Sequence, residues 1–436
     1  MNERKNLMNT LVMTVGTGRS RTDIAKALSF AVEYHKPQQV VLLCSPVTAE
    51  QTLPHIKTFL LDQKISFRSY TISNENNVQS LYQDYLKILQ ELGEPRCITV
   101  DFTSGTKAMS AALFAAAVAL EVGEVSYILG PRDQTGRVVE STEVSSFCPE
   151  LVFAERQLDK ARMLFNKLDF YAAWELAKRY DKTLPADSPL RVQAKTIVLV
   201  SQAYDLWERF QWKRASHLLR KAANPREGLT GVRRERLEAN ADFTRTLAER
   251  PYGEERLFEL YANAGRRLEQ GRYDDALSRL YRAYEYLVQN RLKGGFDVDT
   301  SNLTLQKIEE LPLSRRAHCR LHKKAEECRG PLKLGMVDAI ELLAELKDEV
   351  GIKLFEMYWG RSFRRGLSPN PQKHHGLLQN CLNQRNRSFL AHGTDPAKEE
   401  TVRSMLEAYG ELLKQSMAPK AFDTLSRDSV FITMER

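Results

Sequence analysis

The residues best suited to chemistry are an arginine and a histidine in the segment GLLQNCLNQRNRSFLAH, residues 376–392. Arg385 and His392 stand seven residues apart there. An imidazole can take up or return a proton near neutral pH, and a guanidinium can stabilise charge on a phosphate. The pair could therefore cleave a phosphodiester, with His392 acting on a ribose 2′-hydroxyl and Arg385 on the phosphate.

The same segment predicts one helix that carries this pair on an apolar stripe. Spacings of four, three, four and three connect Leu378, Leu382, Arg385, Phe389 and His392,. At about 100° per residue, Arg385 and His392 lie within about 20° of each other, whereas Arg387 is about 140° from His392. Arg387 is therefore the reserve candidate. Such a stripe normally faces a core or a partner helix, and Gly393 is a candidate for the cap that ends the helix. A buried hydrogen-bonded pair without catalytic function explains the pattern too.

A second candidate site is the loop DFTSGTK, residues 101–107. Hydroxyls, a glycine and a lysine gather where a buried strand meets an Ala-rich helix, as Thr103, Ser104, Gly105, Thr106 and Lys107. Hydroxyls and free backbone amides can bind phosphate or ribose oxygens, and Lys107 adds a positive charge. Helix capping by Thr103 or Ser104 would explain one hydroxyl but not Gly-Thr-Lys. The loop therefore favours an anionic ligand.

A third candidate is the glycine-containing loop VGTGRS, residues 15–20, which follows the first strand and precedes a helix. Its residues Gly16, Thr17, Gly18 and Arg19 would bring backbone amides and a helix N-terminus close to a phosphate,. A tight turn without a ligand explains the glycines as well. Neither loop has the Gly-x-x-x-x-Gly-Lys-Ser/Thr pattern of nucleoside triphosphatases, and no acidic residue completes a dinucleotide-binding pattern. We expect binding of an anion without hydrolysis.

The elements around these loops predict an α/β domain. Strand-like runs alternate with amphipathic helices between residues 11 and 144, as LVMTV, QVVLLC, SFRSYTI, CITVDF and EVSYIL, with a further strand expected near residue 144. Such alternation predicts a parallel sheet covered by helices on both faces, a doubly wound or Rossmann-like fold. Ligands of such sheets bind beyond the carboxyl ends of the strands, at the point where the strand order reverses.

After Pro149 the sequence is helical. Three segments are loosely alike, which indicates packed helical pairs: NKLDFYAAWELAKRY, ERFQWKRASHLLRKA and EQGRYDDALSRLYRA,. Loops near 250–256 suggest a boundary. We predict an α/β domain over 1–150, a helical connecting region over 151–255 and an all-helical domain over 256–436. The tail after Pro419 is expected to be partly disordered.

Composition limits the class of protein. The first 150 residues carry 14 Lys/Arg and 16 Asp/Glu, whereas the rest carries 50 and 40, so the helical part is basic and favours a polyanionic partner,. A basic solvated surface without such a partner is equally consistent. No signal peptide or membrane span is evident, which predicts a cytoplasmic protein. The six cysteines lack metal-binding spacing; His318, Cys319, His322 and Cys328 are a weak zinc candidate,.

The two N-terminal loops resemble the ligand loops of CRISPR-associated Rossmann-fold (CARF) domains, the sensors of type III systems. The resemblance covers roughly residues 8–148 and rests on VGTGRS and DFTSGTKAMSAAL. It implies a homodimer that binds a cyclic oligoadenylate across the two-fold axis. Gly16, Thr17, Gly18 and Arg19 would then line one side of the pocket, and Ser104, Gly105, Thr106 and Lys107 the other. The family often has Gly where Ser104 stands.

The C-terminal motif Arg385-Asn386-x5-His392 resembles the Arg-x4–6-His motif of HEPN ribonucleases, and residues 265–291 resemble the opening helix of such domains. The resemblance implies that single-stranded RNA is cut without a metal or cofactor, leaving a 2′,3′-cyclic phosphate, at a site shared by two subunits. Arg385 and His392 would be catalytic, Asn386 would orient groups, and Arg387 offers a shorter match. Together the two resemblances predict a ribonuclease activated by cyclic oligoadenylate.

Two other classes remain open from the sequence. CARF domains also occur with DNA-binding modules, so a ligand-responsive transcription regulator without nuclease activity is the main alternative, although no compact helix-turn-helix is evident. A metal-dependent nuclease of another fold is suggested only by the Glu-x-Lys spacing of Glu345 and Lys347, which lies in a helical pattern. Binding of duplex DNA without RNA cleavage would favour the regulator.

Overall fold

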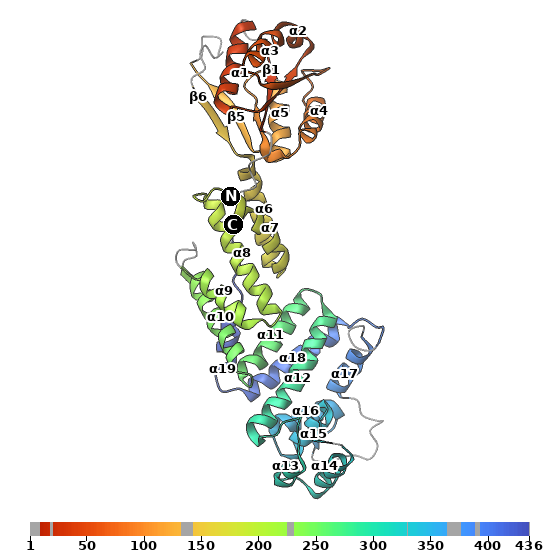
Figure 1. Cartoon of the computed structure of the whole chain (residues 1–436). Helices are drawn as coiled ribbons and strands as arrows, with labels where there is room; N and C mark the ends of the chain where they lie inside the picture. The colour runs from red at the N-terminus through yellow and green to blue at the C-terminus, as the bar shows by residue number, and fades with distance from the viewer. Residues whose placement is uncertain are drawn as a thin grey trace. The chain divides into compact units, whose positions relative to one another are not determined.

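The computed structural model forms two compact units (Figure 1). One comprises residues 1–159 and 182–191, and the other comprises residues 160–181 and 192–436. The structure describes residues 9–17, 21–131, 143–224, 231–328, 330–363, 376–388 and 393–435. The predicted fold class is confirmed: a Rossmann-like α/β unit is followed by helices alone among the described residues after 148.

A six-stranded sheet organises the first unit. Its strands are β1 (Thr10–Val15), β2 (Gln39–Cys44), β3 (Ser66–Thr71), β4 (Ile98–Asp101), β5 (Glu124–Leu129) and β6 (Glu143–Phe147). The order is β3-β2-β1-β4-β5-β6, with β1 to β5 parallel and β6 antiparallel to β5. β1 and β4 are buried along their whole length, as expected for central strands covered on both faces,.

Helices follow the strands of this unit, and some of them begin at polar caps. They are α1 (Arg21–His35), α2 (Pro46–Gln51), α3 (Leu53–Asp62), α4 (Val78–Glu91) and α5 (Lys107–Ala119), with a short 3-10 turn η2 (Pro95–Cys97). Ser45 and Thr48 form a capping box at α2, and Asn77 caps α4,. Two apolar cores lie on the two faces of the sheet, one with α1 and α3 and the other with α4 and α5.

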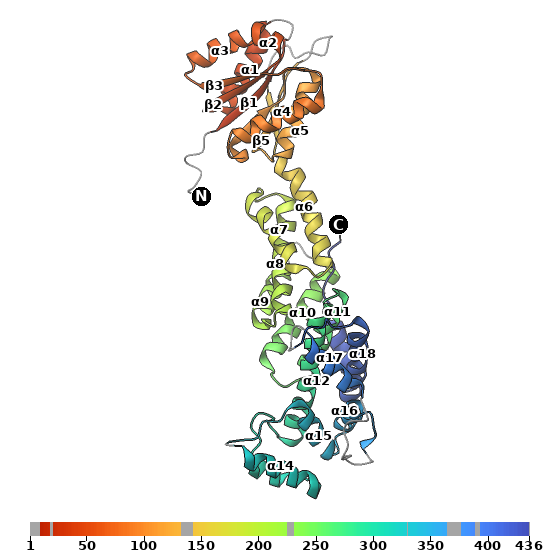
Figure 2. The ribbon, with the colours of Figure 1, turned by 90° about the vertical axis from the view of Figure 1, so that its right-hand side faces the viewer.

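The remaining helices are α6 (Pro149–Asn166), α7 (Phe170–Thr183), α8 (Pro189–Glu208), α9 (Trp212–Ala222), α10 (Gly231–Glu249), α11 (Glu254–Glu269), α12 (Tyr273–Phe296), α13 (Leu305–Glu310), α14 (Arg315–Glu327), α15 (Met336–Glu345), α16 (Glu349–Trp359), α17 (Leu377–Arg387), α18 (Glu399–Ser416) and α19 (Ala421–Asp428). Figure 2 shows α12 close to α17 and α18, which it contacts. A continuous apolar core extends from α11 to α19.

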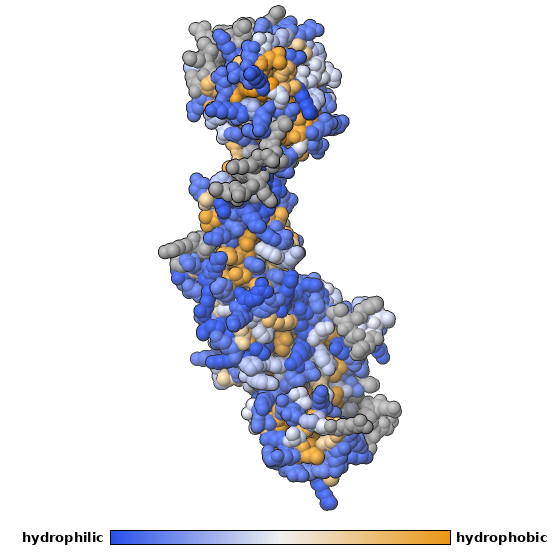
Figure 3. Space-filling view, viewed as in Figure 1, coloured by the Kyte–Doolittle hydropathy of each residue, from blue (hydrophilic) through white to orange (hydrophobic). Residues whose placement is uncertain are grey.

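Hydrophilic side chains cover much of the face shown in Figure 3. No helix among the described residues is long and apolar enough to cross a membrane.

The three similar segments share one turn. Leu168, Phe210 and Gly271 each adopt a positive φ, and a helix begins two residues later in every case. Each turn also has two backbone hydrogen bonds of 2.8–3.0 Å. The amide of the positive-φ residue donates to the carbonyl three residues earlier, and the amide of the following residue donates to the carbonyl five residues before itself. This is the Schellman motif. The same turn therefore joins α6 to α7, α8 to α9 and α11 to α12, and the prediction of a packed helical pair is confirmed for α11 and α12. The third turn also divides residues 265–291 between α11 and α12, although these residues were expected to form one opening helix.

The expectation of a partly disordered C-terminal tail is wrong. After α19 the tail inserts Phe431 among aromatic rings, with its centroid 4.1 Å from that of Tyr204 in a stacked arrangement and 4.9 Å from that of Trp207. Its backbone is paired as well: the Ile432 amide donates to the Tyr204 hydroxyl (3.0 Å), and the Met434 amide donates to the Asn166 side chain (2.9 Å). Aromatic packing and paired backbone groups together order the tail.

We predict that Phe431→Ala lowers the free energy of unfolding of the helical unit by about 3 kcal/mol, because a large cavity would open between Tyr204 and Trp207. Urea unfolding followed by tryptophan fluorescence measures the change. The control is Val430→Ala, whose side chain is 51% exposed, with an expected change below about 0.5 kcal/mol,. Equal stability of the two variants would show that the tail contributes little.

Candidate functional site

The two N-terminal loops meet at the carboxyl end of the sheet. β1 and β4 are adjacent, and the strand order reverses between them, so the loops that follow them border the switch point,. The Gly16 amide donates a 2.8 Å hydrogen bond to the Ser104 hydroxyl. A Cβ at Gly16 would lie 2.7 Å from the Gly105 nitrogen, so only glycine allows this approach,. The loops therefore form one surface.

The second loop is shaped by a glycine in the left-handed region. Gly105 has a φ of +92°, and the preceding carbonyl of Ser104 accepts hydrogen bonds from the hydroxyls of Thr14 and Ser110, the latter at 3.1 Å. Both donors hold the peptide in a fixed orientation. The backbone of the turn is consequently preorganised at the start of α5.

Each hydroxyl of this loop has a separate structural contact. Thr103 accepts from the Ile128 amide at 2.8 Å, and Ser104, which is almost fully buried, accepts from Gly16. Thr106 caps α5 by accepting from the Met109 amide at 3.2 Å, and it donates to the Glu75 carbonyl at 2.7 Å. Capping by Thr103 or Ser104 is therefore wrong, because Thr106 performs it. Glu75 had no sequence signal, since its contribution is a backbone carbonyl.

Lys107 is the charged group that this arrangement leaves exposed, as the first residue of α5. No ion pair connects it to another residue in the described parts of the chain. Positive charge from the lysine and from the helix N-terminus therefore coincides at the switch point. Thr17 is exposed as well, whereas Gly18 and Arg19 lie outside the described residues.

A buried carboxyl lies beneath the second loop. Asp101 ends β4 and accepts hydrogen bonds from the Thr103 amide (3.0 Å) and the Ser126 hydroxyl (2.9 Å), and the His35 ring lies 3.1 Å from the same hydroxyl. Burial raises the pKa of Asp101 above its ordinary value, although these hydrogen bonds oppose the shift. Asp101 therefore supports the loop from within the domain and has no exposed surface for a ligand.

At the other candidate site, the predicted helix over residues 376–392 is too long. α17 ends at Arg387, and Ser388 follows it in an extended conformation. The Asp395 amide donates to the Arg387 carbonyl at 2.9 Å, so the chain after the helix folds back on its end. The angle of about 20° between Arg385 and His392 assumed one continuous helix, and it does not apply.

The apolar stripe faces a core, one of the two expected arrangements, whereas the predicted cap is wrong. Leu378 and Leu382 are buried in the core of their own unit. Gly393 does not cap α17. It lies instead against the end of that helix, where a Cβ would be only 1.9 Å from the Arg387 carbonyl oxygen. His392 directly precedes Gly393 in the sequence but lies outside the described residues.

Arg385 is held by an aromatic ring. Its guanidinium carbon is 4.6 Å from the ring centroid of Tyr281 in α12, within cation–π range,. It also donates a 3.1 Å hydrogen bond to the side chain of Asn386, which is exposed like Arg387. The motif therefore presents polar groups at a surface end of α17. Sequence analysis missed Tyr281, since this residue lies more than a hundred positions before Arg385 in the chain.

The candidate zinc residues are not assembled. His318 and His322 stack one turn apart on α14, and His322 lies 3.3 Å from Glu326. No group of three or more His, Cys, Asp or Glu residues in the described part of the chain is arranged to hold a metal ion. Glu345 and Lys347 lie at the end of α15 and beyond it, as the helical pattern indicated, and Glu345 accepts a hydrogen bond from Ser314.

Comparison with known proteins agrees with this architecture. Residues 248–362 match the family model described as the Csm6 HEPN domain. Enterococcus italicus Csm6 bound to cyclic hexa-2′-fluoro-hexa-dAMP has a similar structure, with a TM-score of 0.60 and 14% identity over 97% of this chain and 98% of that one. A type III CRISPR defence DNA nuclease activated by cyclic oligoadenylate matches 44% of this chain and 33% of that chain, with a TM-score of 0.24 and 15% identity. No curated protein gives a significant match.

The family model confirms the resemblance of residues 248–362 to a CRISPR-associated HEPN domain, and the similar Csm6 structure shares the fold of nearly the whole chain. The family model includes α11, α12 and the helices up to α16, and therefore Tyr281, but it ends before α17. The roles of Arg385, Asn386 and His392, and those of the loop residues, stay predictions.

We predict that Gly16→Ala destabilises the α/β unit by about 1–3 kcal/mol, because the added methyl group would collide with the backbone of Gly105. Thermal unfolding of the full chain, followed by far-UV circular dichroism, measures this. Thr17→Ala is the neighbouring control, with an expected change within about 0.5 kcal/mol, since the Thr17 side chain is exposed,. An unchanged unfolding temperature for Gly16→Ala would contradict the tight contact between the loops.

Proposed function

We propose that this protein is a cyclic-oligoadenylate-activated endoribonuclease that cuts single-stranded RNA in type III CRISPR antiviral defence, in the cytoplasm and without a metal ion. The observation that carries the proposal is the position of Arg385. Arg385 lies at a surface end of α17, and its guanidinium is held on the ring of Tyr281. Tyr281 belongs to the segment that matches the Csm6 HEPN family model. An RNA backbone can reach such a group, whereas a buried structural arginine would be inaccessible.

The proposed chemistry uses the RNA's own 2′-hydroxyl. His392 removes its proton, and the oxygen attacks the adjacent phosphorus to form a 2′,3′-cyclic phosphate. The bond from phosphorus to the 5′-oxygen breaks, and that oxygen takes up a proton as it leaves. Arg385 stabilises the charge that develops on the phosphate, and Asn386, which already contacts Arg385, orients it,. These steps require no metal ion.

The proposed activator site is the surface formed by the two loops at the switch point. A cyclic oligoadenylate carries one phosphate per nucleotide, which suits the exposed Lys107 and the N-terminus of α5,. The similar Csm6 structure was solved with a cyclic hexanucleotide analogue, which supports this ligand class. Gly18 and Arg19 complete the proposed site. A second copy of the chain would supply the other half of the site, and binding would favour the active arrangement of the dimer.

We predict that Arg385→Ala and His392→Ala each lower the cleavage of a fluorescent single-stranded RNA about 100-fold or more, because each removes a group that acts in the transition state. The assay compares initial rates with saturating cyclic oligoadenylate, with and without EDTA, and chelation should leave the rate unchanged.

Arg387→Ala is the matched control for these variants, and it removes the same charge two residues away. If Arg387→Ala abolished cleavage while Arg385→Ala did not, the reserve assignment would replace the first. Wild-type rates in His392→Ala would disprove the catalytic assignment. Duplex DNA binding without any RNA cleavage would favour the regulator.

We predict that Lys107→Ala raises the concentration of cyclic oligoadenylate needed for half-maximal activation about tenfold, because it removes one charge-assisted contact with phosphate. The cleavage rate at saturating activator should stay the same, since the chemistry is elsewhere. Lys87→Ala, an exposed lysine of α4, is the control for net charge. An unchanged half-maximal concentration for Lys107→Ala would contradict the sensor site.

A further inference from the structure

A pocket of about 390 Å³ lies between the connecting helices and the HEPN-matching helices of the same unit. Its walls include three aromatic rings and three guanidinium groups, from Phe210, Trp212, Tyr286, Arg256, Arg279 and Arg282. The volume is in the range of small-ligand sites. The catalytic proposal uses none of these residues.

Each aromatic ring of the pocket has its own arginine. The guanidinium carbon of Arg256 is 4.9 Å from the Trp212 ring centroid, that of Arg282 is 5.2 Å from the Tyr286 centroid, and that of Arg279 is 5.8 Å from the Phe210 centroid. Flat apolar surfaces therefore alternate with positive charge. This combination suits a ligand with a planar aromatic part and an anionic part.

Phe210 is the most unusual member. It is 40% exposed, and it occupies the left-handed position of the turn between α8 and α9, with a φ of +60°. Large side chains rarely adopt that conformation; glycine fills the equivalent position in the turn before α12, and the less exposed Leu168 fills it in the turn before α7,. Neither core burial nor backbone preference accounts for phenylalanine here. A stacking partner from outside the chain would account for it.

The charge of the pocket is only partly neutralised. Arg279 contacts the Asp275 carboxylate at 3.2 Å, and Arg282 contacts the Glu285 carboxylate at 2.7 Å. The Arg256 side chain donates to the Leu247 carbonyl instead of to an acid. Three cations against two carboxylates leave a positive balance, which favours an anionic occupant.

The pocket is close to the catalytic motif because α12 carries parts of both. Ser278, Arg279, Arg282 and Tyr286 line the pocket from one face of α12, while Tyr281 contacts Arg385 from the adjacent face. Tyr281 lies between Arg279 and Tyr286 along the helix axis. At about 100° per residue, Tyr281 lies about 100° around the helix from Arg282, so the two sites share α12 but occupy different faces of it.

We infer that this pocket receives an unpaired base of the substrate RNA, which stacks on Phe210 and Trp212 while the neighbouring phosphates contact Arg256 and Arg282. This inference rests on the proposed function for the identity of the substrate. It gives the connecting region a direct role, because Phe210 and Trp212 belong to it. Duplex RNA is excluded from the pocket, because its bases are already stacked and paired.

The test measures binding without cleavage. A fluorescein-labelled single-stranded RNA with 2′-O-methyl groups throughout lacks the attacking hydroxyl, so its affinity for the full chain follows from fluorescence anisotropy. Phe210→Asn removes the ring and keeps a residue that tolerates a positive φ. Arg282→Gln removes one charge from a side chain that is 45% exposed, which preserves the fold. We expect each to raise the Kd about tenfold.

Arg245→Gln is the matched control, because Arg245 is 49% exposed and has an acidic partner three residues away, like Arg282. It should change the Kd less than twofold, and a duplex of the same length should bind all variants alike. Wild-type affinity of Phe210→Asn and Arg282→Gln for the single strand would overturn the inference, as would an equal loss of affinity for the duplex. If His392→Ala abolished RNA cleavage while the pocket variants bound RNA normally, the pocket inference would be rejected and the nuclease proposal kept. If the pocket variants bound RNA weakly while His392→Ala still cleaved it at the wild-type rate, the pocket inference would be kept and the nuclease proposal rejected.

Discussion

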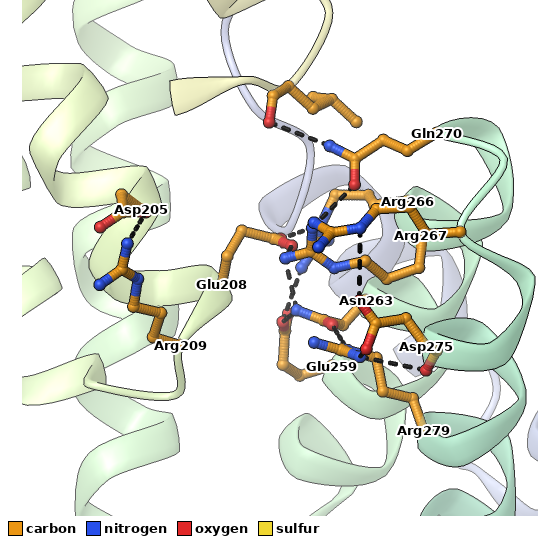
Figure 4. Close-up of polar contacts among 12 residues, drawn as sticks. Asp205, Glu208, Arg209, Glu259, Asn263, Arg266, Arg267, Gln270, Asp275 and Arg279 are labelled. Carbon is orange, nitrogen blue, oxygen red and sulfur yellow. Dashed lines mark hydrogen bonds and ion pairs between the residues drawn. The ribbon is translucent and has the colours of Figure 1, made fainter. Parts of the chain in front are cut away.

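A buried network of charges between α8 and α11 is the interaction on which the helical unit depends. Glu208 accepts hydrogen bonds of 2.5 Å from both Arg266 and Arg267, and Glu259 accepts one of 2.7 Å from Arg266 (Figure 4). Burial raises the pKa of the Glu259 carboxyl, and the nearby Glu208 adds to this effect against the attraction of Arg266. Removing one member would leave a buried charge without its partner, at a cost of about 3–5 kcal/mol.

The network extends to α12 and to the C-terminal tail. Asn263 of α11 accepts a hydrogen bond from Arg279, which ties α12 to the network and lines the pocket at the same time. The Arg266 guanidinium lies 4.4 Å from the ring centroid of Phe431, so the C-terminal tail is anchored there too. With α12 held in this way, Tyr281 positions Arg385 from the neighbouring face. One set of buried contacts thus sets the geometry of both proposed RNA contacts.

Local patterns predicted the elements well because their causes are local or periodic. Buried apolar runs alternating with amphipathic helices predicted the five parallel strands, and the three similar segments predicted helical pairs, because each turn needs a residue with positive φ and a fixed set of backbone hydrogen bonds,. Long-range contacts defeated the same reasoning elsewhere. The apolar periodicity of residues 376–392 continued beyond the end of α17, where Gly393 lies against the helix end and the Asp395 amide donates to the Arg387 carbonyl. Phe431 gave no sign of order because its partners lie some 220 residues earlier.

By itself, the sequence determined the fold class of each unit. It also determined the two loops and the one motif in which function could lie. Residue types, spacing and strand–helix alternation are properties of short segments, so they can be read without the tertiary structure. Only the tertiary structure decided which groups meet. It placed the Gly16 and Ser104 loops together at the switch point, held Arg385 on Tyr281, and assembled the pocket around Phe210 from three separate helices. These contacts join residues far apart in the chain, and they form because the packing of each core brings the elements that carry them side by side.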